Sequence, residues 1–153
     1  MTAVDHGSKL GYARMYKNKS SRSAADFLYR LRYLVAQPTE NLQTDNGSEF
    51  ALEFEKTSSK SGIQKYFSRV KTPEDNPEIE RFNQTLEYEW LYNSNLSLDP
   101  EEFNPRLTEW LVEYNFNRPH QSLVYLTPVE YVEKELAKIH SSVLPMWSAS
   151  TKP

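Results

Sequence analysis

Hydrophobic positions divide the first third of the chain into two short alternating segments and one helical segment. Residues 2–5 and 10–17 alternate loosely around the turn signal at 6–8, which predicts a two-stranded hairpin. From 24 to 35, apolar residues recur at helical spacing behind a run of capping candidates at 20–23. The chain is therefore expected to open with a hairpin followed by an amphipathic helix.

The middle of the chain predicts two short strands that flank a small helix. Residues 40–44 form a short strand candidate that leads directly to Asp45. Residues 50–56 predict a short helix, and the Ser- and Gly-rich run 57–62 is expected to end it. Residues 63–70 predict the second strand.

Three helices are predicted in the second half, each with a readable start. Pro77 suits a first helical position, Asp99 precedes another proline, and residues 127–130 form a capping box. Helical apolar stripes follow each start; the first of them is Ile79, Phe82, Leu86 and Trp90. We therefore expect one domain over residues 1–140 and a polar tail over 141–153.

Composition narrows the possible functions. The chain has 153 residues, 38% of them hydrophobic, which suits a single packed domain. With no cysteine, the sequence excludes disulfides, thiolate zinc sites and a cysteine nucleophile. No apolar run approaches the roughly 18 residues of a membrane span, so we expect a cytoplasmic protein without a membrane partner.

Charge is distributed unevenly along the chain. The net charge is −3, but residues 1–71 carry +5 and residues 72–153 carry −8. The segment 56–71 contains basic residues and no acid. Its basic residues are Lys56, Lys60, Lys65, Arg69 and Lys71. Such a patch either attracts a phosphate backbone or is an ordinary solvated surface.

Two carboxylates have the placement of a metal site. Asp45 follows a strand candidate, and Glu80 lies in the first turn of a predicted helix. Carboxylates on different rigid elements can converge on a hard divalent cation, which prefers oxygen ligands. The alternatives are a tight Asp-Asn-Gly turn at Asp45 and a favourable helix-dipole contact at Glu80. Glu78 fits the dipole alternative better than Glu80 does.

Three segments in order resemble one protein family. They are Thr44-Asp45-Asn46-Gly47-Ser48-Glu49-Phe50, residues 72–83, and Tyr114-Asn115-Phe116-Asn117-Arg118-Pro119-His120-Gln121-Ser122-Leu123 followed by Thr127-Pro128. Together they resemble the catalytic core of the DDE polynucleotidyl transferases, the superfamily of retroviral integrases and insertion-sequence transposases. The resemblance covers nearly the whole chain and implies an α/β, ribonuclease H-like mixed sheet with flanking helices.

The resemblance implies metal-dependent DNA cleavage and strand transfer in DNA integration. Family members place three carboxylates around two Mg²⁺ or Mn²⁺ ions, which activate the nucleophile and stabilise the leaving oxygen. By motif match, Asp45 is the second acid and Glu80 the third, while Arg81 and the basic segment hold DNA. The family works as multimers, so homo-oligomers or association with a full-length transposase are expected.

The first acid of the family has no match within the chain. Residues 4–8 match the turn after the family's second strand, which makes Asp5 a turn residue. The first strand, central in the sheet, is then expected upstream of Met1, leaving the sheet incomplete and strand transfer impaired. The alternative makes Asp5 a substitute metal ligand.

Other function classes stay open at this point. The chain could be a non-catalytic DNA-binding or transposase-interacting module, a decayed insertion-sequence remnant, or a generic ribonuclease H-like nuclease. Arg118 and His120 could contact phosphate or a partner subunit, or their loop could only brace two helices.

Overall fold

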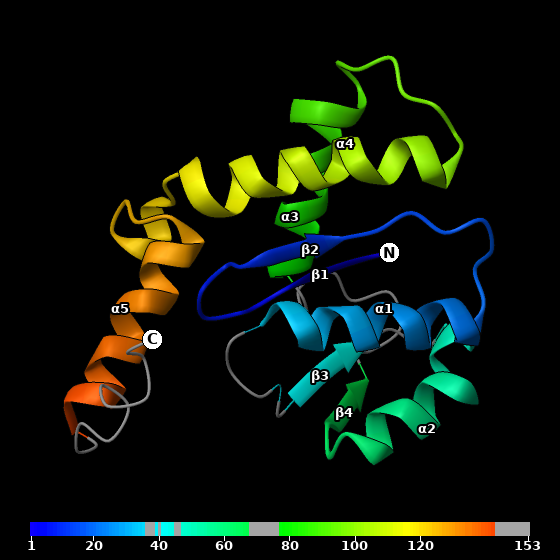
Figure 1. The fold of residues 1–153 in the computed structure, drawn as a ribbon, viewed down its shortest axis with the longest axis horizontal. Helices are drawn as coiled ribbons and strands as arrows, with labels where there is room; N and C mark the ends of the chain where they lie inside the picture. The colour runs from blue at the N-terminus through cyan, green and yellow to red at the C-terminus, as the bar shows by residue number, and fades with distance from the viewer. Residues whose placement is uncertain (36–38, 40, 45–46, 68–76, 143–153) are drawn as a thin grey trace, which may run out of the picture.

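The fold is given by a computed structural model, which describes residues 1–35, 39, 41–44, 47–67 and 77–142. Its strands are β1 (Thr2–Val4), β2 (Gly11–Ala13), β3 (Asn41–Thr44) and β4 (Gln64–Phe67). Its α-helices are α1 (Ser21–Leu34), α2 (Glu53–Lys60), α3 (Pro77–Leu86), α4 (Pro100–Val112) and α5 (Pro128–Ser142). Short helical turns are η1 (Ser48–Phe50), η3 (Glu87–Leu91), η4 (Glu113–Asn117) and η5 (Gln121–Leu123). The predicted α/β class is confirmed (Figure 1).

The four strands form two separate two-stranded sheets. β1 and β2 are antiparallel, with the register running from Thr2↔Ala13 to Val4↔Gly11. β3 and β4 are parallel, with the register running from Asn41↔Gln64 to Thr44↔Phe67. In Figure 1 the strands follow one another in the order β2, β1, β3, β4. Both pairing types of a mixed sheet are therefore present, but among the described residues no hydrogen-bonded ladder joins the two pairs.

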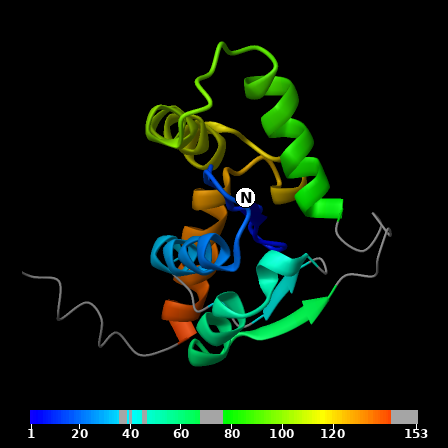
Figure 2. The ribbon, with the colours of Figure 1, turned by 90° about the vertical axis from the view of Figure 1, so that its right-hand side faces the viewer.

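Helices cover both faces of the hairpin, with α1 on one side and α3 on the other (Figure 2). One buried cluster joins the hairpin to α3 and α4 through Ala13, Phe82, Leu86, Leu107, Leu111 and Tyr114. A second cluster joins α1, α2 and the segment before β4 through Ala24, Leu28, Phe54 and Ile63. The hydrophobic core therefore consists of two clusters, one packed on the β1–β2 hairpin and one around α1, α2 and the segment before β4.

The predicted helix starts are confirmed at three places. The Ser20 hydroxyl caps α1 by accepting from the Ser23 N–H at 3.2 Å, and the Asp99 carboxylate caps α4. At α5, the Glu130 carboxylate accepts from the Thr127 N–H at 2.8 Å, and the Thr127 hydroxyl accepts from the Glu130 N–H. These caps satisfy backbone donors that the first turn leaves without partners.

Two predicted boundaries are wrong. The helix expected over 50–56 is α2, which continues through Lys60 instead of ending at the serine run. Hydroxyls within that run donate back to carbonyls one turn earlier, and Gly62 at φ +68° follows the end of the helix. The second hairpin strand, expected over 10–17, spans only Gly11–Ala13, and Met15 beyond it hydrogen-bonds to the Asn104 side chain. Residues 68–70 and the tail from 143 lie outside the described residues.

Within the described part of the chain, no helix is both long and apolar enough to cross a membrane.

Candidate metal and nucleic-acid site

The helix that carries Glu80 is anchored on the hairpin by Phe82. This side chain is 1% exposed and packs over Gly11, where an added Cβ would lie 2.3 Å from the Phe82 ring. The Asn115 side chain fixes Gly11 itself, accepting from its N–H and donating to its C=O, both at 2.8 Å. The first turn of α3 is therefore held firmly against β2.

The two glutamates of this first turn have different surroundings. Glu78 forms an ion pair with Lys9 in the hairpin turn at 2.9 Å, and both side chains are mostly buried. Glu80 is exposed, and its carboxylate forms no hydrogen bond or ion pair with another described residue. Glu78 thus ties α3 to the hairpin, whereas Glu80 presents its carboxylate to solvent.

Asp45 lies outside the described residues, so its pairing with Glu80 stays a prediction. Two oxygen atoms close to these acids in the sequence have no hydrogen-bond partner among the described residues. Within the part of the chain that the structure describes, Thr44 Oγ1 at the end of β3 and Asn83 Oδ1 one turn after Glu80 are both buried without a hydrogen-bond partner. Among the described residues no group of three or more His, Cys, Asp or Glu is placed to hold a metal ion.

Sequence reasoning missed Glu49, a buried carboxylate in the same segment as Asp45. Its side chain is 6% exposed and pairs with Lys19 at 2.9 Å. Burial raises the pKa of Glu49, but the Lys19 contact and a backbone hydrogen bond outweigh burial and leave the pKa below its ordinary value. A Cβ added at Gly47 would lie 2.5 Å from the carboxylate, so a larger residue there would require the Glu49 side chain to move. The only sequence signal was an acid four positions after Asp45.

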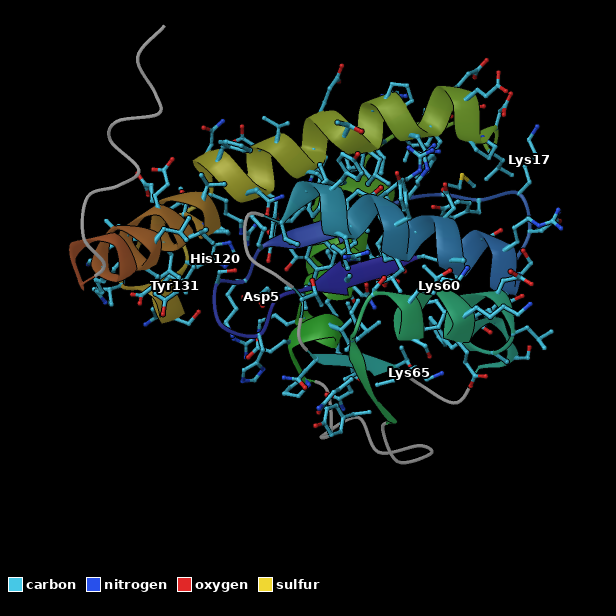
Figure 3. The ribbon with its side chains drawn as sticks, turned by 60° about the horizontal axis from the view of Figure 1, so that its bottom comes forward. Asp5, Lys17, Lys60, Lys65, His120 and Tyr131 are labelled. Carbon is cyan, nitrogen blue, oxygen red and sulfur yellow. The ribbon has the colours of Figure 1, made fainter. Side chains whose placement is uncertain are left out.

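Asp5 serves the hairpin turn. One of its carboxylate oxygens accepts hydrogen bonds from the Ser8 N–H and the Ser8 hydroxyl, both at 2.7 Å. Figure 3 shows Asp5 at the turn end of the hairpin, away from Lys60 and Lys65. These contacts favour the turn interpretation, while a role as metal ligand stays untested.

The lysine and arginine residues predicted to bind DNA differ in the contacts that their side chains make with the rest of the chain. Lys65 donates to the Phe50 carbonyl at 2.8 Å and pairs with Glu55 at 3.3 Å, with its side chain only 12% exposed. Lys56 pairs with Glu53 on the surface of α2. Lys60 and Arg81 are exposed, and their side chains form no hydrogen bond or ion pair with the rest of the described chain. Arg69 and Lys71 lie outside the described residues.

The loop after η4 is occupied by internal contacts. Arg118 pairs with Glu89, and the His120 ring packs edge-on against Tyr114 at 5.0 Å between ring centroids. The His120 backbone N–H donates to the Leu126 carbonyl at 3.0 Å. Burial, reinforced by neighbouring cations, lowers the pKa of His120. These contacts favour the interpretation that the loop braces two helices.

Comparison with known proteins shows similarity to integrases in both the family model and a curated relative. Residues 61–128 match the family described as "Integrase core domain". The protein named "Putative integrase ORF3" of Spiroplasma virus SpV1-C74 is 23% identical over 146 residues, covering 84% of this chain. The chain spans 40% of the length of that curated relative.

Solved structures resemble the fold. The catalytic core domain of BIV integrase matches with a TM-score of 0.70 and 23% identity, covering 91% of this chain and 88% of that one. The magnesium complex of the HTLV-2 integrase catalytic core domain matches with a TM-score of 0.65 and 19% identity, covering 85% and 81%. A chain of the simian T-cell lymphotropic virus intasome matches with a TM-score of 0.64 and 24% identity, covering 76% of this chain and 42% of that one. The chain therefore has the ribonuclease H-like fold of retroviral integrase catalytic cores, and its similarity to the integrase core family supports an integrase- and transposase-like core.

Proposed function

We propose that this chain acts in DNA integration or transposition, as a metal-dependent core for DNA cleavage and strand transfer. The observation that carries the proposal is the exposed carboxylate of Glu80, which no other described residue engages. It lies on a helix anchored in the hairpin, inside the segment that matches the integrase core family. A neighbouring glutamate on the same turn is already used in an ion pair, so Glu80 is the acid left for ligand binding.

Asp45 and Glu80 would hold Mg²⁺ or Mn²⁺. Close to these acids in the sequence, Thr44 Oγ1 and Asn83 Oδ1 are oxygen atoms without a hydrogen-bond partner among the described residues. Hard divalent cations prefer such oxygen ligands. When bound, these ions activate an oxygen nucleophile and offset charge on the phosphate. The protein's own contribution is positional, because Phe82 and Glu78 fix the helix that presents Glu80.

The cations would hold the phosphate backbone of DNA. Lys60 and Arg81 are the best placed of the described set, because neither side chain forms a hydrogen bond or ion pair with another described residue. Lys65 is part of the contact between β4 and η1, so its role is mainly structural. A homo-oligomer or a complex with a full-length transposase would suit the chain, since the structural relatives include a trimeric core and an intasome.

We further propose that strand transfer by this chain alone is weak. The motif match gives two of three acids, and the Asp5 carboxylate is engaged by Ser8. These two observations favour a second candidate function, that of a DNA-binding or transposase-interacting module without catalytic activity.

Fluorescence anisotropy with a labelled DNA duplex, measured across a salt series, tests DNA binding. Arg81→Gln is expected to weaken binding and to lower the salt slope by about 0.9 for each phosphate that the variant no longer neutralises. Lys138→Gln is the matched control, because Lys138 pairs with Glu135 on α5. Absence of salt-sensitive binding, or equal weakening by both variants, would contradict the proposal.

A nicking assay in Mn²⁺ separates the enzyme from the module. Slow nicking that is abolished in both Asp45→Asn and Glu80→Gln supports a weak enzyme. DNA binding with no nicking supports the second candidate, and efficient nicking by the parent contradicts the proposed impairment.

A further inference from the structure

The outer face of α1 presents two tyrosine rings to solvent. The opposite face of this helix is buried in the core through Phe27 and Leu28. Tyr29 and Tyr33, one turn apart, are 56% and 79% exposed, and their ring centroids are 5.5 Å apart. Together with Arg32 they line a surface hollow of about 290 Å³. Two aromatic rings are therefore open to a flat ligand beside one guanidinium group.

The guanidinium group of Arg32 is held in place by the end of α2. It donates to the Ser61 hydroxyl at 2.8 Å, and this hydroxyl donates in turn to the Thr57 carbonyl at 2.7 Å. The other N–H groups of Arg32 form no hydrogen bond with another described residue. Lys60 directly precedes Ser61, and its exposed side chain has no partner in the described part of the chain. Two cations with most of their hydrogen-bonding capacity unused therefore lie near the two rings.

The charges of α1 and α2 leave an excess of positive charge. The acids of the two helices each pair with a cation, namely Asp26 with Arg30, Glu53 with Lys56, and Glu55 with Lys65. Arg22, Arg32 and Lys60 form no ion pair with another described residue. Arg22 and Lys60 both interact electrostatically with the Glu53 carboxylate, and Arg32 contacts Ser61 at the other end of α2. The three unpaired cations therefore lie where α1 and α2 adjoin, and with the two tyrosines they form what is here named the α1–α2 face.

A nucleic-acid strand with unpaired bases matches the chemistry of the α1–α2 face. Its phosphates complement the unpaired cations, and each base has a flat face that stacks on an aromatic ring. The bases of a duplex are already stacked on one another, so tyrosine rings stack on bases only where the strand is single. From Arg22 to Arg32 the helix rises about 15 Å, which is the length of roughly four nucleotides at about 3.4 Å each.

We propose that the α1–α2 face binds single-stranded DNA, with unpaired bases stacked on Tyr29 and Tyr33. The phosphates of the strand contact the three unpaired cations of this face. Because α1 and α3 lie on opposite sides of the hairpin, the site is separate from the helix that carries Glu80 (Figure 2). The inference rests on the proposed function only in taking DNA, and not RNA, as the nucleic acid, and it requires no metal ion.

Fluorescence anisotropy of the full chain with a labelled oligothymidylate tests the site. Changing both Tyr29→Ala and Tyr33→Ala should weaken binding about tenfold or more, because the stacking rings are lost. The matched control changes both Tyr88→Ala and Tyr92→Ala, which removes another exposed tyrosine pair, at η3, with ring centroids 5.6 Å apart. This control should bind like the parent. Arg32→Gln should lower the salt slope by about 0.7, whereas Arg32→Lys should retain it.

Duplex binding distinguishes a failure of this inference from a failure of the proposed function. If Arg81→Gln weakens duplex binding while loss of Tyr29 and Tyr33 leaves oligothymidylate binding unchanged, only the single-strand site is refuted. Binding of neither nucleic acid would contradict both. Equal weakening by the two tyrosine-pair variants, or tighter binding of the matching oligoribonucleotide, would also overturn the inference. So would self-association, measured by sedimentation, that disappears when Tyr29 and Tyr33 are removed, because a second copy of the chain would then occupy this face.

Discussion

Gly11→Ala should destabilise the protein by a purely steric mechanism. The new Cβ would lie 2.3 Å from Cε2, 2.9 Å from Cζ and 3.0 Å from Cδ2 of Phe82. Phe82 is 1% exposed and contacts Trp110 and Tyr114, so its ring has little room to move. Gly11 has no positive φ, so backbone strain is not involved.

The size of the effect follows from these contacts. Overpacking a well-packed core costs about 1–3 kcal/mol, and Gly11 cannot shift without disturbing its two hydrogen bonds to Asn115. Phe82→Leu removes the clashing ring atoms and alone should cost a few kcal/mol through the space it leaves. In the double variant the added methyl partly fills that space. We therefore expect the double variant to be more stable than the sum of the two losses by about 0.5–3 kcal/mol.

Urea unfolding of the four proteins of this cycle, followed by tryptophan fluorescence, measures the coupling. Similar m-values would confirm that the changes act on the folded state. Strictly additive losses would refute the contact between α3 and β2. A Gly11→Ala protein as stable as the parent would refute it as well.

Three further predictions concern stability. Asn115→Ala leaves the buried N–H and C=O of Gly11 unpaired and should cost about 1–3 kcal/mol by urea unfolding, whereas the exposed Asn117→Ala should change stability by less than about 0.5 kcal/mol. Thr127→Ala removes one hydrogen bond of the α5 capping box and should lower the unfolding free energy by about 1 kcal/mol, which Thr127→Ser should largely prevent. Burial lowers the pKa of His120 below its ordinary 6.5. As the pH falls below 6.5, His120 is therefore protonated in the unfolded chain before it is protonated in the folded one, and the free energy of unfolding decreases until the pH reaches the folded pKa. His120→Phe should flatten this part of the pH profile of stability; an unchanged profile would contradict the burial of the neutral ring.

Local signals were enough to predict most of the helical structure. The cap at Ser20, the proline at the start of α3 and the capping box at Thr127 act within one turn, so the sequence shows them directly. The stripe of α3 was also confirmed, because Phe82 and Leu86 are buried at helical spacing.

Long-range contacts were not predictable in this way. Asn115 hydrogen-bonds to Gly11 across 104 positions, and nothing near either residue signals that pairing. The ion pair of Glu49 with Lys19 is equally hard to read from local sequence, which is why this acid was missed. Glu80 was selected by motif match, and the structure adds that no other described residue engages its carboxylate.

Thermal unfolding with and without Mn²⁺ most directly tests the claim that Asp45 and Glu80 hold a metal ion. At about ten times the dissociation constant, metal should add roughly 1.4 kcal/mol to the stability of the folded state. This gain is expected in the parent and in Glu135→Gln, in which only a surface ion pair to Lys138 on α5 is removed. No gain is expected in Asp45→Asn or Glu80→Gln. An equal gain in all four proteins, or none in the parent, would contradict the proposed metal site.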